Sequence, residues 1–483
     1  MSPESAKQGS SISGTSFEEP TRVRYGVLAL ACGLSMITYL DRACFGVAAP
    51  ELAKDLGLSG QEDLRGAFTA FSIAYAAFEI PAGWLGDRWG PRGTLIRIVI
   101  WWSVCTALTA IVGLKVGAMT LGSLSLLMVL RFMFGAGEAG AYPNIARVLH
   151  NWFPRQQWEA VQGMIWMSGR LAGGITPLIW ALLVSGTAFT PALVPSWRWA
   201  FVIFGLIGFL WCAAFAKVFR NRPSEHPGVN RAEAEFIGNA GEASSHGHHV
   251  PWGKLIFNRS VTALCLMYSL VNYGWIFNIT YLAGYIKNRF SLADSDVMGA
   301  LLKGSPLWVG ALGCIAGAVC VNLMTTVMGN RRRGRQAVGV MAMVLCAACW
   351  LGARGAGNVY LFCMCVSMAA FGVDLTLGAV WATCQDIGGK HTAVTAAYMN
   401  TVGTLGSAVA SWLTGAIVSW HVDGVAKQQG TTAELMAKEA LRSATLDGYD
   451  FVFLTYSAVY VVAAVCWCLI DASQSLEPNE SHR

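Results

Sequence analysis

The stretch GWLGDRWGPR, residues 83–92, follows one long apolar run, 64–86, and leads into another, 94–114. Its glycines allow two helices to approach closely, and Asp87 can stabilise a helix terminus. Its arginines can pair with acids or with the carboxyl ends of helices. Each flanking run has about the 20 residues that an α-helix needs to cross a bilayer. The stretch therefore predicts a tight turn between two membrane-spanning helices.

The composition of the whole chain agrees with this interpretation. Of its 483 residues, 54% are hydrophobic and 13% are charged, whereas soluble domains carry about 45–50% and about 25%. Soluble enzymes, nucleic-acid-binding proteins and disordered scaffolds are therefore disfavoured. The net charge of +6 is spread over many short segments, so no nucleic-acid partner is expected. Most of the 14 cysteines lie in apolar runs, where a free thiol behaves as a small hydrophobic side chain, and neither a metal nor a cofactor is expected.

About twelve apolar runs are long enough to cross a bilayer, which predicts an all-α membrane protein of twelve transmembrane helices. A long polar stretch divides them into two halves of six helices each. A second polar stretch, at 421–450, is expected to join the last two helices. The predicted spans are residues 25–48, 64–86, 94–114, 121–146, 158–185, 198–218, 258–286, 298–327, 336–354, 357–380, 392–420 and 450–472.

Lysine and arginine are unevenly distributed between the two faces of this predicted protein. If both termini are cytosolic, that side carries 20 of the 34 basic residues and the other side carries 11. Because cytosolic loops carry the excess of Lys and Arg, both termini are predicted to be cytosolic. The expected location is a bacterial inner membrane. The expected division is a disordered tail at 1–24, a first half at 25–218, a cytosolic loop at 219–257, a second half at 258–472 and a tail at 473–483.

Seven ionisable residues lie well inside the predicted spans. A charge at the bilayer centre costs about 2.5–3.5 kcal/mol on insertion scales, so these side chains should face a protein interior or a water-filled cavity. Arg131 and Glu138 are seven residues apart and so share one helix face. Tyr75 and Glu79 share a face at four-residue spacing. The seven residues are Asp41, Arg42, Glu79, Arg131, Glu138, Arg170 and Asp374.

The charges of these seven residues predict a transport mechanism. With all seven ionised their sum is −1, and protonation of two acids changes it to +1. A protonated cavity therefore attracts an anion, and loss of the protons on the cytosolic side expels it. Buried acids titrate near working pH. The pattern predicts import of an anion together with protons, across the lipid bilayer.

The turn at 83–92 resembles the signature loop of the major facilitator superfamily, which lies between the second and third of twelve spans. The corresponding stretch of the second half, 328–335, is a degenerate version of this loop: it is basic but lacks the acid. The resemblance covers the whole chain and implies two six-helix halves around a central site, in a protein that is a monomer. It also implies that Gly83, Asp87, Arg88 and Arg92 stabilise one face of the transporter. The alternative is that these charges only set the topology.

Four further motifs are similar to the anion:cation symporter family within that superfamily. They are ITYLDR at 37–42, RFMFGAGEAG at 131–140, the Gln, Trp, Arg and Gly pattern at 162–174, and Met-Asn with a following Gly at 399–403. The family includes bacterial galactonate, glucarate and hexuronate transporters, phthalate-type permeases, and animal sialic-acid and vesicular glutamate carriers. The motifs are specific for the family and say little about the substrate.

The resemblance implies a role for each matching residue. Arg42 would bind the carboxylate of the substrate, because a guanidinium group matches a carboxylate with two hydrogen bonds. Arg131 would either join Arg42 or hold Glu138, and Asp41 and Glu138 would exchange protons. The hydroxyl groups of a sugar would be contacted by Tyr39, Tyr75, Gln162, Trp381, Thr383 and Asn400.

Three residues depart from the common pattern of the family. Glu79 stands where a neutral Gln is frequent, and it is expected to pair with the loop arginines as readily as to face the cavity. Arg170 adds a cation that either contacts substrate or pairs with Asp374 or Glu138. Asp374 adds an acid in the predicted span at 357–380, where it could equally be a structural partner. Three arginines with nearby Tyr, Gln, Asn and Trp favour a sugar acid such as a hexuronate or aldonate. An aromatic-acid or dicarboxylate permease and a proton-independent facilitator or exporter remain as alternatives, whereas a membrane enzyme or sensor is disfavoured.

Overall fold

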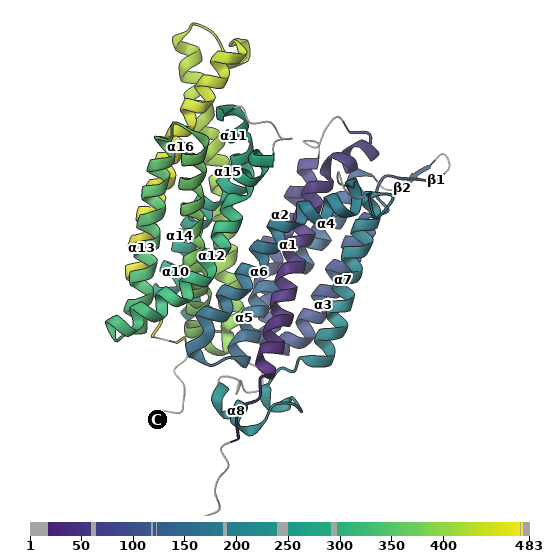
Figure 1. Cartoon of the computed structure of the whole chain (residues 1–483), viewed down its shortest axis with the longest axis vertical. Helices are drawn as coiled ribbons and strands as arrows, with labels where there is room; N and C mark the ends of the chain where they lie inside the picture. Colours follow the sequence, from purple (N-terminus) through teal and green to yellow (C-terminus); the bar gives the residue numbers. More distant parts are fainter. Residues whose placement is uncertain are drawn as a thin grey trace, which may run out of the picture.

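The computed structural model describes residues 18–58, 64–116, 119–121, 123–186, 191–238, 250–290, 297–473 and 475–476. Its long helices form two bundles that stand side by side, one from each half of the chain (Figure 1). The predicted tail at 1–24 lies outside the described residues as far as residue 17, and α1 begins at Val23. Most of the predicted tail at 473–483 also lies outside them.

The first bundle contains seven of the described α-helices, because one predicted span is divided into α4 and α5. Pro143 stands in the first turn of α5 and has no N–H to donate to the carbonyl of residue 139, so the helix is interrupted there. The helices are α1 (Val23–Asp55), α2 (Arg65–Trp89), α3 (Pro91–Thr109), α4 (Leu124–Glu138), α5 (Ala141–Trp152), α6 (Trp158–Trp180) with a π-helical turn at Ala181–Ser185, and α7 (Trp197–Val218).

The second bundle begins with an irregular helix. A π-helical turn at Phe277–Tyr281 joins α10 to α11, and the Phe277 ring packs edge-on against Trp350 and Phe453 in the core. The helices are α10 (Arg259–Ile276), α11 (Leu282–Phe290), α12 (Val297–Met328), α13 (Arg331–Arg354), α14 (Val359–Gly388), α15 (Thr392–Gln428) and α16 (Lys438–Leu469).

Within the described residues, nine segments are long and apolar enough to cross a membrane. One of them, Val359–Gln428, comprises both α14 and α15. The helices α2 and α3, which carry several charged residues, pack in the first bundle beside the others. The protein is therefore a multi-pass membrane protein whose helices are consistent with the twelve predicted spans.

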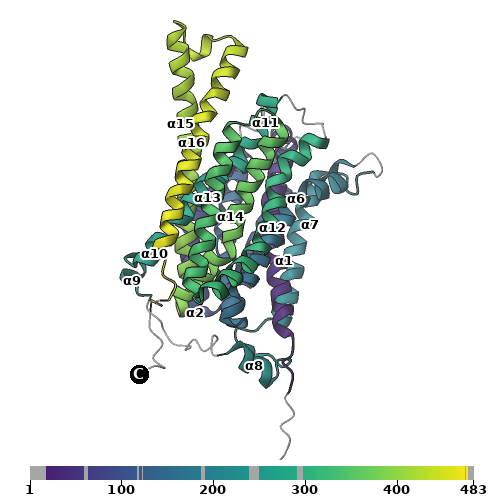
Figure 2. The same ribbon diagram turned by 60° about the vertical axis from the view of Figure 1, so that its left-hand side comes forward.

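Two connections differ from the sequence-based expectation. A short antiparallel hairpin, β1 (Leu114–Val116) and β2 (Met119–Leu121), follows α3, because Gly113 has a positive φ of 69° that ends the helical turn. The expected polar connection at 421–450 is largely helical, and α15 and α16 project together beyond the bundle (Figure 2). Buried contacts hold this projection, and they come from Val422, Ala426, Met436 and Ala444.

The two ends of the molecule are distinguished by these features. We call the end where α1 begins and α16 finishes the terminal end, and the end where α15 and α16 project the hairpin end (Figure 1). At the terminal end the short helix α8 (Arg231–Ile237) lies against the start of α1. Its buried Glu233 accepts hydrogen bonds from the backbone N–H groups of Val23 and Arg24 and pairs with the Arg24 side chain at 2.9 Å. The central loop therefore caps the first helix.

Candidate substrate site and gate

Arg42 is a partly exposed cation inside the first bundle. Its Nε lies 3.0 Å from Oε2 of Glu138, which is fully buried, whereas 31% of the Arg42 side chain is exposed. The guanidinium carbon stacks 4.8 Å from the centre of the Tyr75 ring. Nη2 of Arg42 and Oε1 of Glu138 have no hydrogen-bond partner among the described residues. Arg42 therefore retains donors that can bind an anion.

Arg131 interacts electrostatically with this pair but, within the described residues, forms no hydrogen bond with Glu138. Its guanidinium carbon lies 4.1 Å from the Phe45 ring centre, 4.7 Å from that of Phe134 and 4.9 Å from that of Phe71. Nε of Arg131 has no hydrogen-bond partner among the described residues. Of the two partners considered for Glu138, Arg42 and not Arg131 makes the hydrogen bond.

Asp41 is buried beside these charges and faces a different side of α1 from Arg42. Both of its carboxylate oxygens are without a hydrogen-bond partner among the described residues. It interacts electrostatically with Glu138 and Arg131. A buried carboxyl with no hydrogen bond is costly in its charged form, so Asp41 can accept a proton.

Arg170 joins the two halves of the molecule at mid-depth. Its Nε and Nη2 donate to the two oxygens of Asp374 on α14, each at 2.9 Å, and Nη1 donates to the Tyr39 hydroxyl at 2.8 Å. The guanidinium carbon also lies 3.9 Å from the ring centre of Trp275. Asp374 is therefore the partner that neutralises Arg170.

Aromatic rings from both halves meet close to Arg170. The Trp166 ring stacks on Tyr142 with centroids 4.5 Å apart, and Trp381 of the second half lies 5.3 Å from Trp166. Gln162, one turn before Trp166 on α6, is buried, and its Nε2 has no hydrogen-bond partner among the described residues. Three aromatic rings therefore lie together beside an amide N–H group that is available to donate a hydrogen bond.

Glu79 faces the second half of the molecule and not the loop arginines. Asn400 donates a hydrogen bond to Oε1 of Glu79, and the Thr401 hydroxyl donates to Oε2 at 3.1 Å. The guanidinium group of Arg88 stacks on Trp84, and Arg92 donates to the carbonyl of Ala216. The expected pairing of Glu79 with this loop is therefore not observed, because its helix face is turned towards α15.

Asp87 connects the signature loop to the start of α15. Its carboxylate accepts hydrogen bonds from the backbone N–H groups of Ala393, at 3.1 Å, and Val394, at 2.8 Å. Arg147 lies 3.5 Å from the same carboxylate and donates to the carbonyls of Gly389 and Lys390. An acid from the first half thus caps a helix of the second half. Arg88 and Arg92 contact groups of their own half.

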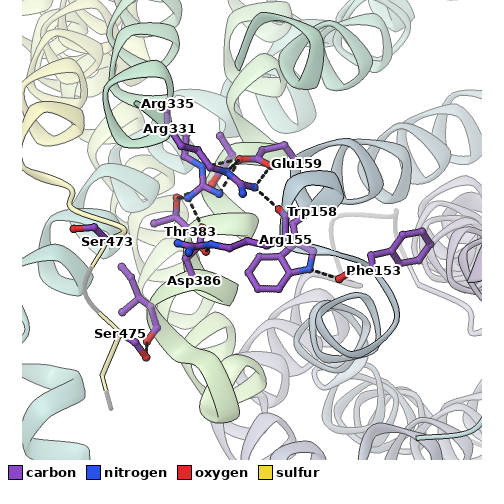
Figure 3. A network of polar contacts seen from close by, with 12 residues as sticks. Phe153, Arg155, Trp158, Glu159, Arg331, Arg335, Thr383, Asp386, Ser473 and Ser475 are labelled. Carbon is purple, nitrogen blue, oxygen red and sulfur yellow. Dashed lines mark hydrogen bonds and ion pairs between the residues drawn. The ribbon is translucent and has the colours of Figure 1, made fainter. Parts of the chain in front are cut away.

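A second ion-pair network closes the same end of the molecule (Figure 3). Glu159, at the start of α6, binds Arg331 and Arg335 of α13, with Arg335 Nε at 2.7 Å from Oε1. Arg335 also lies 2.6 Å from Asp386 of α14, which pairs in turn with Arg155 of the first half. The acid missing from the basic stretch at 328–335 is therefore supplied by the opposite half.

Thr383 belongs to this network and not to the group around Arg42. Its hydroxyl accepts a hydrogen bond from Arg335 Nη1 at 3.3 Å (Figure 3). Glu159, Asp386 and Arg147 were not among the residues predicted for the site. A run of four arginines within residues 331–335 was the available signal, because buried guanidinium groups require acids and their own half supplies none in that loop.

Gly83 permits the close contact between α2 and α15. A Cβ at this position would lie 2.7 Å from the Ala393 carbonyl oxygen and 2.8 Å from the Ala397 Cβ. We expect Gly83→Val to hold the terminal end open. In a background without native cysteines, a membrane-impermeant thiol reagent should then label Thr401→Cys faster from that side. Gly93→Val is the matched control, because a Cβ there meets nothing within 4 Å. Equal labelling in both variants would contradict the packing argument.

Comparisons with known proteins agree with this architecture. The family model of the Major Facilitator Superfamily matches residues 31–411. A probable sulfoacetate transporter of Cupriavidus necator is 30% identical over 389 residues, covering 79% of this chain and 84% of that protein. A hexuronate transporter of Bacillus subtilis is 27% identical, covering 73% and 78%, and a probable galactarate/D-glucarate transporter of Escherichia coli K12 is 26% identical, covering 69% and 74%.

Solved structures share the fold at low sequence identity. The proton:xylose symporter XylE has a TM-score of 0.68 at 14% identity, with 93% of this chain and 96% of that chain covered. The Escherichia coli fucose:proton symporter has a TM-score of 0.63 at 13% identity, covering 93% and 100%. The family model and the sequence relatives together show that the chain belongs to the major facilitator superfamily and, within it, to the anion:cation symporter family.

Proposed function

We propose that the protein imports an organic anion by proton symport, with a sugar acid such as a hexuronate or aldonate as substrate. The terminal end then faces the cytosol of a bacterial cell, and the protein acts as a monomer in the inner membrane. The hexuronate and galactarate/D-glucarate transporters among its relatives support this class of substrate. The observation that carries the proposal is the pair formed by the partly exposed Arg42 and the buried Glu138.

Arg42 and Glu138 provide a direct exchange between proton and substrate. While Glu138 is ionised, it occupies one edge of the guanidinium group. A proton that enters Glu138 removes its charge and leaves Arg42 free to bind a carboxylate with two hydrogen bonds. Loss of the proton restores the ion pair and displaces the anion. The proton and the anion therefore favour one another at this site.

The other buried charges determine the net charge of the site. Arg170 and Asp374 neutralise one another through two hydrogen bonds, so they contribute little net charge. The charges that remain are the positive Arg42 and Arg131 and the acids Asp41 and Glu138, which are negative when ionised. When both acids are protonated, the two arginines leave a positive site that attracts an anion.

The contacts between the two halves at the terminal end support a conformation that is closed at that end and takes up the anion from the hairpin end. Asp87, Glu159 and Asp386 join the halves there, through α15, Arg335 and Arg155. An anion would enter from the hairpin end and leave once these pairs separate. Such separation of the two halves is alternating access about a central site.

The test is uptake into proteoliposomes of labelled glucuronate, galacturonate and galactonate, with and without an inward proton gradient. We expect the gradient to drive accumulation of at least one of them. Glu138→Gln should abolish the accumulation but retain exchange, because the neutral amide imitates the protonated acid. Accumulation that ignores the gradient would overturn proton symport.

Further arms of the same experiment separate the substrate classes. Sulfoacetate is included because a relative 30% identical to this chain is described as its probable transporter. An aromatic acid and a dicarboxylate represent the other permeases of the family. Transport of one of these three, with no movement of the sugar acids, would overturn the sugar-acid assignment and leave anion transport standing.

A further inference from the structure

One face of α2 runs along the start of α15 from the middle of the molecule to the terminal end. The residues of this face recur every four positions, so they form a continuous stripe. Glu79 contacts Asn400 and Thr401, Gly83 packs on Ala393 and Ala397, and Asp87 binds the first turn of α15. Glu79 is the innermost polar contact of this stripe. The stripe, which we call the α2–α15 seam, must open when the terminal end opens.

Glu79 differs from the carboxyl groups that join the two halves at the terminal end. Asp87, Glu159 and Asp386 each have an arginine within 3.5 Å. Glu79 is fully buried, and within the described residues its hydrogen bonds come from the neutral Asn400 and Thr401. Within the part of the chain that the structure describes, no ion pair of Glu79 is recorded.

The charged and titratable groups around Glu79 come from three helices. Arg42 of α1 interacts with it electrostatically, but its closest acid is Glu138, at 3.0 Å. Tyr75 lies one turn earlier on α2 and stacks on Arg42. On α4, Arg131 is enclosed by phenylalanine rings, and Glu138 is engaged by Arg42. The α15 groups that touch Glu79 are an amide and a hydroxyl, neither of which carries charge.

An ionised carboxylate in such a place would be costly. A buried charge needs a paired charge as well as hydrogen bonds, and Glu79 has only neutral partners. A neutral carboxylic acid fits better, because it accepts the Asn400 amide N–H through one oxygen and can donate its own proton to the Thr401 hydroxyl. The contacts of Glu79 therefore match a protonated side chain.

We propose that Glu79 is a proton-binding site of the transport cycle, protonated while the α2–α15 seam is closed and deprotonated when the seam opens. This inference rests on the proposed proton symport and adds a third carrier to Asp41 and Glu138. Opening the seam removes Asn400 and Thr401 and brings water to the carboxyl. The O–H bond of Glu79 then breaks, and its proton passes to water on the terminal side.

The deprotonated state also assists release of the substrate. The new carboxylate lies one turn from Tyr75 and interacts electrostatically with Arg42. It therefore competes with a bound anion for the same guanidinium group. For the next cycle, Glu79 takes up a proton from the hairpin side once the seam has closed. Each cycle therefore moves one proton more than Asp41 and Glu138 alone would carry, in the same direction as the anion.

The first test is infrared spectroscopy of the full-length protein in lipid nanodiscs. The C=O band of protonated carboxyl groups should lose one component in Glu79→Gln, because the amide keeps both hydrogen bonds but has no acid proton. Thr401→Val should shift that component, since it removes one hydrogen bond and leaves Glu79 in place. An unchanged band in both variants would overturn the proposal.

The second test is the ratio of protons to labelled galactonate, determined from the membrane potential that just stops net flux in proteoliposomes. Glu79→Gln should lower the ratio by one proton. The control Thr404→Val removes a hydroxyl that donates to the Asn400 carbonyl of its own helix, and it should leave the ratio unchanged. A ratio that is equal in wild type and Glu79→Gln would overturn the third carrier. If wild type moves no protons with any anion, proton symport fails, and the infrared component still decides the state of Glu79.

Discussion

Substituting alanine for Arg42 is expected to lower anion uptake by roughly 100-fold, because a charge-assisted hydrogen bond contributes about 1.5–3 kcal/mol and each 1.4 kcal/mol is about tenfold. The loss should appear as weaker anion binding, measured by protection of the purified protein against thermal unfolding. Arg42 carries the partly exposed guanidinium group at the centre of the first bundle, and its Nη2 has no partner among the described residues.

Two companion variants separate binding from folding. Arg42→Lys keeps the positive charge next to Glu138 but lacks the planar fork, so it should fold well and still bind the anion poorly. Arg42→Ala combined with Glu138→Gln removes the unpaired buried acid and should regain stability without regaining uptake. Uptake near the wild-type level in Arg42→Lys would show that the charge alone, and not the fork, binds the anion.

Substituting asparagine for Asp374 is expected to destabilise the protein by about 3–5 kcal/mol, the range found when one partner of a buried ion pair is removed. Arg170 would keep its hydrogen bond to Tyr39 and its contact with Trp275. It would lose its negative partner, and one of the two acceptor oxygens would be replaced by an amide NH2 that can only donate. The measurement is the apparent midpoint of thermal unfolding in detergent. Uptake should fall as well, because the pair joins α6 to α14 across the two halves.

The double variant Arg170→Met and Asp374→Leu is the control for this result. Replacing a buried pair by apolar side chains of similar volume is often neutral, so the double variant should unfold at a higher temperature than Asp374→Asn. Arg231→Ala, which breaks an exposed pair with Glu235, should leave the midpoint unchanged. An Asp374→Asn protein as stable as wild type would show that water reaches Arg170 in the resting state.

The spans could be predicted from the sequence because the bilayer requires long apolar helices. Their ends could not, because polar residues there are satisfied by distant parts of the chain. The predicted span at 357–380 stops before Thr383, yet α14 continues to Gly388. Gln385 donates to the carbonyl of Ala146, and Asp386 pairs with Arg335, so the last turns of α14 are buried without an apolar sequence.

The members of the candidate site could be predicted in part, but their partners could not. Arg42, Glu138, Arg170 and Asp374 stand out because a charge inside a span requires a reason. A single sequence does not show that Glu138 bonds to Arg42 and not to Arg131, since both lie within reach of one helix face. The projection of α15 and α16 was missed for another reason, because a polar helix in water lacks the apolar run that identifies a span.

Because Asp87 caps α15, contact between the two halves at the terminal end also affects the stability of that helix. The first N–H groups of a helix have no carbonyl partner inside the helix, and an acidic cap contributes about 0.5–2 kcal/mol. Here Ala393 and Val394 receive that cap from the opposite half, so the beginning of α15 is complete only while the halves touch. When they part, the first turn of α15 loses this cap. Contact between the halves and the stability of that turn are therefore thermodynamically linked, so a change that stabilises one is expected to stabilise the other.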